Sequence, residues 1–270
     1  MNNLINMIQN KIGSDYEVKH EVIYKTNGVK MKAFVIKKTK GNFALTVYYN
    51  DTDSDEEIYN HVLKVFHDEK GNIKDVVDPN NLLNYDNASV IVYNKEKNPT
   101  WESIYVTEDI DGLDLGLLYI INVEMESGIK GTVKLKRELP NIPFDLKEKA
   151  YKNIENDILI QTMADVLGFQ DAAMEEMLII SNKSKVYGFE AVMTNTVKTY
   201  LKDKFGSLDN LIIIPSSIHE AIVLEKKDGM IVDEFCKIIR AVNSTEVSPT
   251  DYLSDNAYGY DSNGKLRILR

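Results

Sequence analysis

The chain has 270 residues, an apolar fraction of 43% and a formal net charge of −10 at pH 7. This composition suffices for a buried core and argues against general disorder, and the negative charge argues against a general affinity for nucleic-acid backbones. The single cysteine, Cys236, excludes an internal disulfide framework and a zinc site made of several thiolates.

The first part of the chain predicts a three-stranded antiparallel meander with flanking helices. Apolar residues at helical spacing predict a helix over 3–12. Alternating patterns predict strands at 16–26, 30–38 and 42–50. Asn27-Gly28 is a strong hairpin signal between the first two strands. Ser54 followed by Glu57 is a capping-box pattern, which predicts a second helix that ends near residue 70.

The middle of the chain predicts a short helical piece at 78–83 and further strands at 89–94, 113–125 and 130–139. We expect these strands to extend the first sheet. Two prolines within residues 139–143 interrupt both helices and ladders. They predict a boundary between an N-terminal lobe, 1–139, and a C-terminal lobe, 140–270.

The second half alternates helices and strands. Helices are predicted at 144–158, 188–206 and 232–242, a helical or irregular piece at 159–174, strands at 176–182, 208–217 and 218–225, and a hairpin at 257–269. The predicted fold class is α+β with two lobes. An antiparallel sheet with flanking helices forms the first lobe, and a mixed α/β lobe in the order strand-helix-strand-strand-helix forms the second.

The usual signatures of cofactor and metal sites are missing from the sequence. It has no phosphate-binding GxxxxGK[ST] loop, no GxGxxG after a strand and no HExxH. The acidic stretch at 51–57 is better explained as a helix N-terminus, where the helix dipole favours negative charge, than as a calcium loop. We therefore expect no cofactor and no bound metal.

The stretch IIIPSSIHEAIVLE, at 212–225, places two hydroxyls, an imidazole and a carboxylate within five residues: Ser216, Ser217, His219 and Glu220. They form either a reactive cluster or a tight turn between two strands. The glycines of a nucleophile elbow are missing, and strand alternation sends His219 and Glu220 to opposite faces. A turn whose hydroxyls bond to the backbone is therefore the favoured interpretation.

Several segments in this order resemble a domain-of-unknown-function family of gut Clostridia and related bacteria that is often met near mobile elements. They are TNGVKMKAFVI, NKSKVYGFEAV, IIIPSSIHEAIVLE and VNSTEVSPTDYLSDNAYGYD, and they carry the motifs NKSxxYG, PSSxHE and LSDxxYxYD. The resemblance implies a cytoplasmic bacterial or phage-related protein and no established activity.

The polar motif positions define a candidate site, either a binding surface or a set of caps and turns. Its residues are Ser216, Ser217, His219, Glu220, Asn182, Ser184, Asn243, Ser254 and Asp255.

Three functions are weighed against one another. The leading one is a non-enzymatic binding or regulatory protein, and enzymatic activity is left open. The second is a hydrolase or transferase that uses the cluster at 216–220. The third is an acidic protein that mimics nucleic acid and counters host defence.

The uneven charge and the absence of membrane signals bear on partners and location. Residues 17–47 are rich in lysine and residues 51–86 in acids, which suggests an acidic face that docks on a protein with a basic surface. The negative net charge argues against nucleic acid as a partner. No apolar run approaches the roughly 18–20 residues of a membrane-spanning helix and no signal peptide is recognisable, so we expect a cytoplasmic protein without membrane contact.

Overall fold

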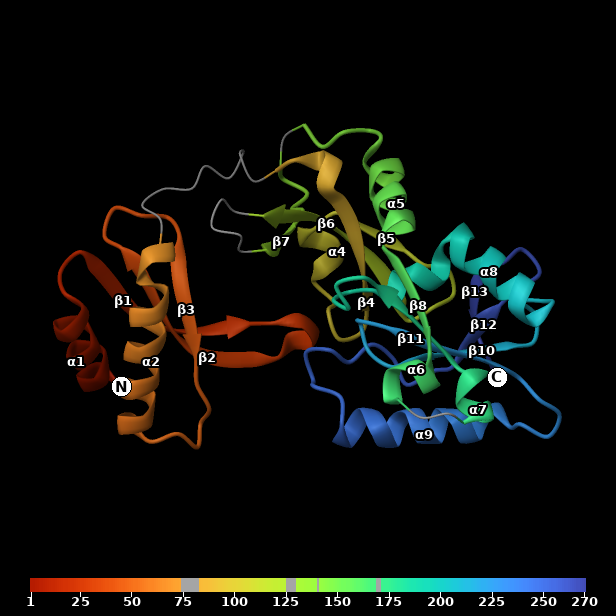
Figure 1. Ribbon diagram of the computed structural model, residues 1–270. Coiled ribbons are helices and arrows are strands. Elements are labelled where there is room, and N and C mark those ends of the chain that lie inside the picture. The colour runs from red at the N-terminus through yellow and green to blue at the C-terminus, as the bar shows by residue number, and fades with distance from the viewer. Residues whose placement is uncertain (74–82, 125–129, 140, 169–170) are drawn as a thin grey trace. The chain divides into compact units, whose positions relative to one another are not determined.

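The computed structural model describes residues 1–73, 83–124, 130–139, 141–168 and 171–270 (Figure 1). Its backbone contacts form two compact units. Unit 1 comprises Met1–Leu83 and Glu124–Ile129, and unit 2 comprises Asn84–Val123 and Lys130–Arg270. The helical piece predicted at 78–83 lies outside the described residues, apart from Leu83.

Unit 1 contains the predicted meander and its two helices. Its elements are α1 (Asn2–Ile12), β1 (Tyr16–Tyr24), the 3₁₀ turn η1 (Thr26–Gly28), β2 (Lys30–Lys38), β3 (Ala44–Tyr48), α2 (Asp55–Glu69) and the 3₁₀ turn η2 (Lys70–Asn72). The strands pair antiparallel in the order β1-β2-β3. Leu4 and Ile8 of α1 and Val62 of α2 pack with the apolar face of the sheet, which forms one core.

Two local signals explain why these elements begin and end where they do. Asn27 and Gly28 both adopt positive φ, at 61° and 68°, which turns the chain between β1 and β2. The Ser54 hydroxyl accepts a hydrogen bond from the Glu57 amide, and the Glu57 side chain accepts one from the Ser54 amide. The predicted hairpin and capping box are therefore confirmed.

The strands of the middle segment do not extend the first sheet, so that prediction was wrong. They form a separate four-stranded antiparallel sheet in unit 2: β4 (Ala88–Asn94), β5 (Thr107–Asp109), β6 (Leu115–Glu124) and β7 (Lys130–Lys134). The reason lies in β4 and β6, which are apolar on both faces. Their side chains Ile91, Tyr93 and Leu118 pack with Trp101 in a core of their own. With both faces covered, these strands are stabilised by packing within unit 2 and pair with one another.

A six-stranded antiparallel sheet forms the rest of unit 2, in the order β13-β12-β10-β11-β9-β8. The strands are β8 (Ile158–Thr162), β9 (Leu178–Asn182), β10 (Leu211–Pro215), β11 (Ala221–Glu225), β12 (Tyr258–Tyr260) and β13 (Leu266–Ile268). The helices of unit 2 are α4 (Trp101–Ile104), α5 (Leu146–Asn156), α6 (Met163–Leu167), α7 (Ala172–Glu175), α8 (Asn195–Phe205) and α9 (Val232–Thr245), with 3₁₀ turns η3 (Tyr85–Asn87) and η4 (Phe189–Met193). In Figure 1, α9 lies on one side of this sheet and α5 and α8 lie on the other.

Two segments of unit 2 differ from the predicted elements. Residues 159–174, expected to be helical or irregular, begin with the edge strand β8. The helix predicted at 188–206 is broken at Thr194, whose extended backbone ends η4 and whose hydroxyl caps α8 by accepting from the Val197 amide. A buried N-cap inside an amphipathic pattern separates two helices that the periodicity alone joins.

The compact units divide the chain differently from the predicted lobes, 1–139 and 140–270. Asn153 of α5 donates hydrogen bonds to the carbonyls of Asp86 and Ala88 at the start of β4, which ties this strand to the second half. The α+β class is confirmed, with antiparallel sheets in both units. Among the described residues, none of the helices combines the length and the hydropathy that crossing a bilayer requires.

Candidate functional site

The connection between β10 and β11 holds the four clustered polar residues of the PSSxHE motif. The Ser217 hydroxyl accepts the His219 amide at 3.0 Å, and the Ser216 hydroxyl donates to the Glu220 carboxylate at 3.2 Å. The Ser217 amide donates to the Glu220 carbonyl at 3.4 Å and closes the turn. Both hydroxyls are thus engaged within the turn, and neither bonds to the imidazole.

The His219 imidazole connects this turn to the loop after β9. Its Nδ1 accepts the backbone amide of Tyr187 at 3.0 Å, so the ring proton sits on Nε2, which lies 3.6 Å from Asp251 Oδ1. The His219 carbonyl accepts from the Gly188 amide at 3.0 Å and the Ser181 hydroxyl at 2.7 Å. His219 therefore bonds from both its backbone and its ring to the strand and loop beside it.

The loop that receives His219 is shaped by the Asn182 side chain. Its Oδ1 accepts from the Ser184 hydroxyl at 2.9 Å and the Val186 amide at 3.1 Å, and its Nδ2 donates to the Val186 carbonyl at 2.7 Å. Lys185 and Tyr187 both adopt positive φ, at 55° and 57°. Two non-glycine residues in the left-handed region are uncommon, and the Asn182 amide supplies the bonds that hold them there.

Of the remaining predicted residues, Asn243 lies near the end of α9, and Ser254 and Asp255 lie on the segment that leads to β12. Asn243 donates from Nδ2 to the Ser254 carbonyl at 3.0 Å and to Asp255 Oδ1 at 2.8 Å. The fully buried Ser254 donates to Asp114 Oδ2 at 2.6 Å, and the Tyr258 hydroxyl donates to Asp114 Oδ1 at 2.6 Å. Burial and the adjacent Asp114 carboxylate raise the pKa of the Tyr258 phenol, which keeps it a donor.

Asp251 contacts the PSSxHE turn from the segment that leads to β12. Its carbonyl accepts the Ile218 amide at 2.9 Å in the PSSxHE turn, and its carboxylate faces the His219 ring. The motif residues therefore form two hydrogen-bonded groups. One joins the loop after β9 to the β10–β11 turn and to Asp251, and the other joins Asn243, Ser254 and Asp255 with Asp114.

We predict that the ring of His219 contributes to stability chiefly as an acceptor. His219→Ala leaves the Tyr187 amide without its partner, and we expect a loss of about 1–3 kcal/mol. In His219→Asn the side-chain Oδ1 takes a position close to that of Nδ1, so most of the loss should be recovered. Urea denaturation of both variants measures the difference. An equal loss in both would instead assign the effect to the Asp251 contact or to ring packing on Tyr187.

Sequence reasoning missed one group with unusual surroundings, Glu190 of η4. Its side chain is 4% exposed, and no partner for its Oε2 exists among the described atoms. Burial raises its pKa well above the ordinary glutamate value. Burial and the carboxylates of Glu108 and Glu190 raise the pKa of nearby Tyr151 to about 12. The sequence signal was weak, because Glu190 follows Phe189 in what reads as one amphipathic helix.

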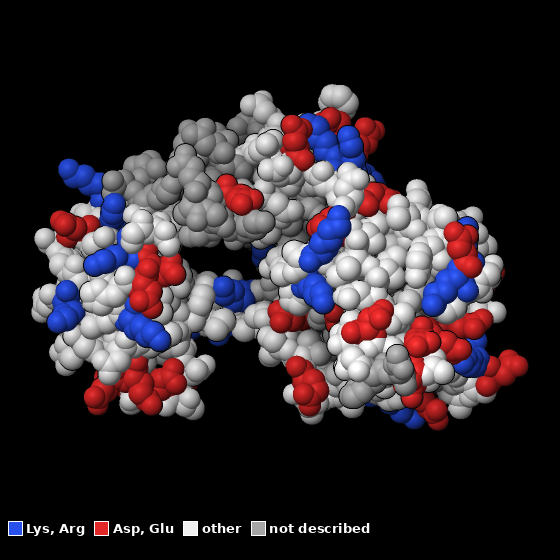
Figure 2. All heavy atoms as spheres, viewed as in Figure 1, with Lys and Arg blue, Asp and Glu red and all other residues white. Residues whose placement is uncertain are grey.

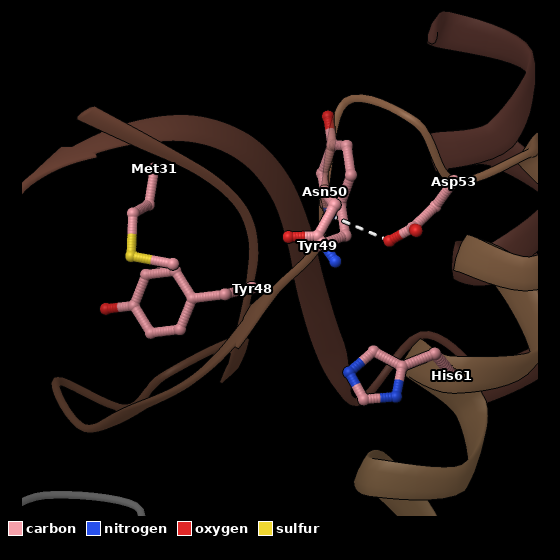
Figure 3. A pocket seen from close by; sticks show the side chains of 6 residues that line it. All are labelled: Met31, Tyr48, Tyr49, Asn50, Asp53 and His61. Carbon is pink, nitrogen blue, oxygen red and sulfur yellow. Dashed lines mark hydrogen bonds between the residues drawn. The ribbon is translucent and has the colours of Figure 1, made fainter. Parts of the chain in front are cut away.

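A hollow of about 280 Å³ opens in unit 1, where β3 leads into α2. Figure 3 shows Met31 and Tyr48 on one side, Asp53 and His61 on the other, and Tyr49 between them. The Tyr49 hydroxyl lies 2.6 Å from Nε2 of His20. Burial lowers the pKa of His20, and the positive charge of Lys32 lowers it further. The wall of this hollow is thus aromatic and its far side carries a carboxylate.

The surroundings of this hollow are acidic. Asp55, Glu56 and Glu57 occupy the first turn of α2, and Figure 2 shows acidic side chains gathered at that end of unit 1. Asp53 accepts the Asn50 amide through Oδ2 at 2.7 Å, as the dashed line in Figure 3 marks, which fixes the carboxylate at the hollow. Lys25 lies 4.2 Å from the centroid of the Tyr48 ring, so one face of this ring already makes a cation–π contact within the chain.

Within the described ranges, no three His, Cys, Asp or Glu side chains converge as metal ligands. Cys236 is partly buried and packs against the core beneath α9.

The comparisons with known proteins identify a family for the chain. No curated protein and no solved structure is significantly similar to the chain. One family model, described as a family of unknown function (DUF5688), matches residues 1–262. Since the match spans nearly the whole sequence and both units, the chain belongs to the DUF5688 family.

Proposed function

We propose that the protein is a non-enzymatic binding protein that captures a lysine or arginine side chain of a basic partner protein in the hollow of unit 1. One observation supports the proposal. The Tyr48 ring, with Met31 beside it, lines the same hollow as the carboxylate of Asp53, which is held in place at the acidic start of α2. Ring face and carboxylate together are the arrangement that attracts a cationic side chain.

The size of the hollow supports a single side chain as its occupant. Its volume of about 280 Å³ lies below the roughly 300–1,000 Å³ of pockets that enclose drug-sized molecules. An acidic surface around an aromatic hollow also steers a basic partner and accelerates its association. The ligand class is therefore a basic side chain presented by a protein surface.

The alternatives have less support. A hydrolase at 216–220 needs a serine hydroxyl on the imidazole, whereas Ser216 bonds to Glu220 and Ser217 to the His219 amide. A nucleic-acid mimic needs a continuous acidic stripe, whereas lysines and acids alternate over the face drawn in Figure 2. Cytoplasmic location and a link to mobile elements belong to the proposal as the setting of such a binding protein.

A labelled lysine- and arginine-rich peptide tests the site by fluorescence anisotropy. We expect Tyr48→Leu, which removes the ring, to weaken binding about two- to fivefold, the range of a cation–π contact at an exposed site. Asp53→Asn should weaken binding by a similar factor, because the amide oxygen keeps the Asn50 bond but not the charge. Tyr48→Phe keeps the ring face and should bind as the wild type does.

The matched control is Asp68→Asn, an exposed aspartate near the other end of α2 with the same change in charge. It should leave the affinity unchanged. If Asp68→Asn weakens binding as much as Asp53→Asn, the attraction is general to the acidic surface and the hollow is not a site. Turnover of a substrate by the protein alone, lost in His219→Asn, would instead favour the hydrolase.

A further inference from the structure

A second hollow, of about 490 Å³, lies in unit 2 between α8 and the turn that joins β12 to β13. Its lining is almost wholly polar. The lining residues used below are Asn195, Lys198, Thr199, Lys202, Ser207 and Asp261. We call this hollow the α8 groove.

Helix periodicity explains why two lysines of α8 lie beside its buried face and line the α8 groove. Val197 and Leu201 are the buried residues of α8, and Lys198 and Lys202 each follow one of them, so they flank the buried stripe one turn apart. A Cβ built on Gly264 would lie 3.7 Å from Lys198 Cδ. The stem of Lys198 therefore runs along the β12–β13 turn, and its ammonium reaches the groove.

Lys198 is a half-buried cation without a fixed partner. In the described part of the chain, no hydrogen bond or ion pair engages its ammonium, and partial burial lowers its pKa more than Glu155 and Asp261 raise it. A partly desolvated ammonium gains free energy when an anion binds beside it.

Two of the carboxylates near the α8 groove are engaged in local structure. Glu155 accepts the amides of Asn195 and Thr196 at 2.9 and 3.3 Å and so occupies the N-terminus of α8. Asp261 Oδ1 accepts the amides of Asn263 and Lys265 at 2.9 and 2.8 Å. These bonds spread the two carboxylate charges over backbone donors. Asp209 also lines the groove, from an exposed position where solvent screens its charge.

We propose that the α8 groove binds a small polyanion through a terminal phosphate or carboxylate group that pairs with Lys198 and Lys202. The side chains of Asn195, Thr199 and Ser207 supply hydrogen-bond donors for its oxygens. The proposal is independent of the basic-side-chain site in unit 1, since it concerns other residues and a ligand of opposite charge.

The test uses the full chain with ¹³C-methylated lysines, whose methyl signals are followed by NMR. Sodium pyrophosphate is added in one titration and sodium citrate in another, and sodium chloride keeps the ionic strength constant. We expect saturable shifts of the Lys198 and Lys202 signals with at least one of the two anions. A response to pyrophosphate alone assigns a phosphate ligand, and a response to citrate alone assigns a carboxylate. Non-saturating shifts with both would overturn the proposal.

Two variants of α8 separate a site from general attraction. Lys198→Gln should weaken binding at least about tenfold, the worth of one charge-assisted hydrogen bond. Lys204→Gln removes the same charge from an exposed position that does not line the groove, and it should bind within about twofold of the wild type. Equal losses in the two variants would contradict the proposal, and thermal melting confirms that both variants fold.

Discussion

Gly188→Ala is expected to destabilise unit 2 by about 3 kcal/mol or more, the upper range for forcing extra atoms into a packed site. A Cβ at Gly188 would lie 2.4 Å from the Ser181 hydroxyl, 2.5 Å from the Asn182 amide nitrogen and 2.8 Å from the His219 carbonyl oxygen. Two of these three atoms belong to the backbone, so neither β9 nor the PSSxHE turn can move away from the added Cβ without a large cost in free energy. Urea denaturation followed by circular dichroism measures the loss.

Two further variants make this expectation specific. Gly131→Ala adds a Cβ at an ordinary contact distance, 3.7 Å from Val123, and should change the stability by less than about 0.5 kcal/mol. Adding Ser181→Ala to Gly188→Ala removes only the hydroxyl clash and should not restore stability. Full restoration by Ser181→Ala would show that the backbone approach is not the constraint.

Glu190→Gln should stabilise the protein at neutral pH and have little effect at pH 4. Burial raises the folded-state pKa of Glu190 above the ordinary value of 4.5, so the unfolded chain releases this proton at a lower pH than the folded chain. The wild type therefore loses stability as the pH rises through the interval between the two pKa values. Across that interval the stability difference between variant and wild type should grow by about 1.4 kcal/mol per pH unit.

Unfolding free energies measured at several values between pH 4 and pH 7 test this expectation. Glu246→Gln, at an exposed position just after α9, serves as the control for removal of a carboxylate. If the Glu190→Gln and wild-type curves run parallel, the buried carboxyl is not the group that titrates. Asp157 adds repulsion against an ionised Glu190, so a second carboxylate acts in the same direction.

Local elements were predictable where one residue type fixes the backbone. The positive φ of Asn27 and Gly28 and the cap at Ser54 follow from side-chain size and hydrogen-bonding capacity alone, without any tertiary contact. The break at Thr194 was not predictable in this way. Its hydroxyl caps α8 inside a continuous amphipathic pattern, and the choice between one helix and two depends on what packs around it.

The sheet arrangement and the candidate site show the same limit. Apolar runs indicated that β4 and β6 are strands but could not say which strands they pair with. The polar residues around 216–220 were recognised, yet the bond from the Tyr187 amide to His219 joins segments 32 residues apart. Glu190 was missed because burial of a carboxylate depends on the elements packed over it.

The bonds to Asp114 affect the order in which unit 2 can be completed during synthesis. The hydrogen-bond donors to the Asp114 carboxylate are the hydroxyls of Ser254 and Tyr258, which are 140 and 144 residues further along the chain. These bonds cannot form before both residues have been synthesised. A ribosome that adds about 5–20 residues per second makes these donors roughly 7 to 29 seconds later. Until then the four-stranded sheet carries a hydrated carboxylate where the finished protein has a sheltered one. Such late, long-range contacts are typical of slow-folding β structure, and unit 2 cannot reach its final hydrogen bonding until its last strands have been synthesised.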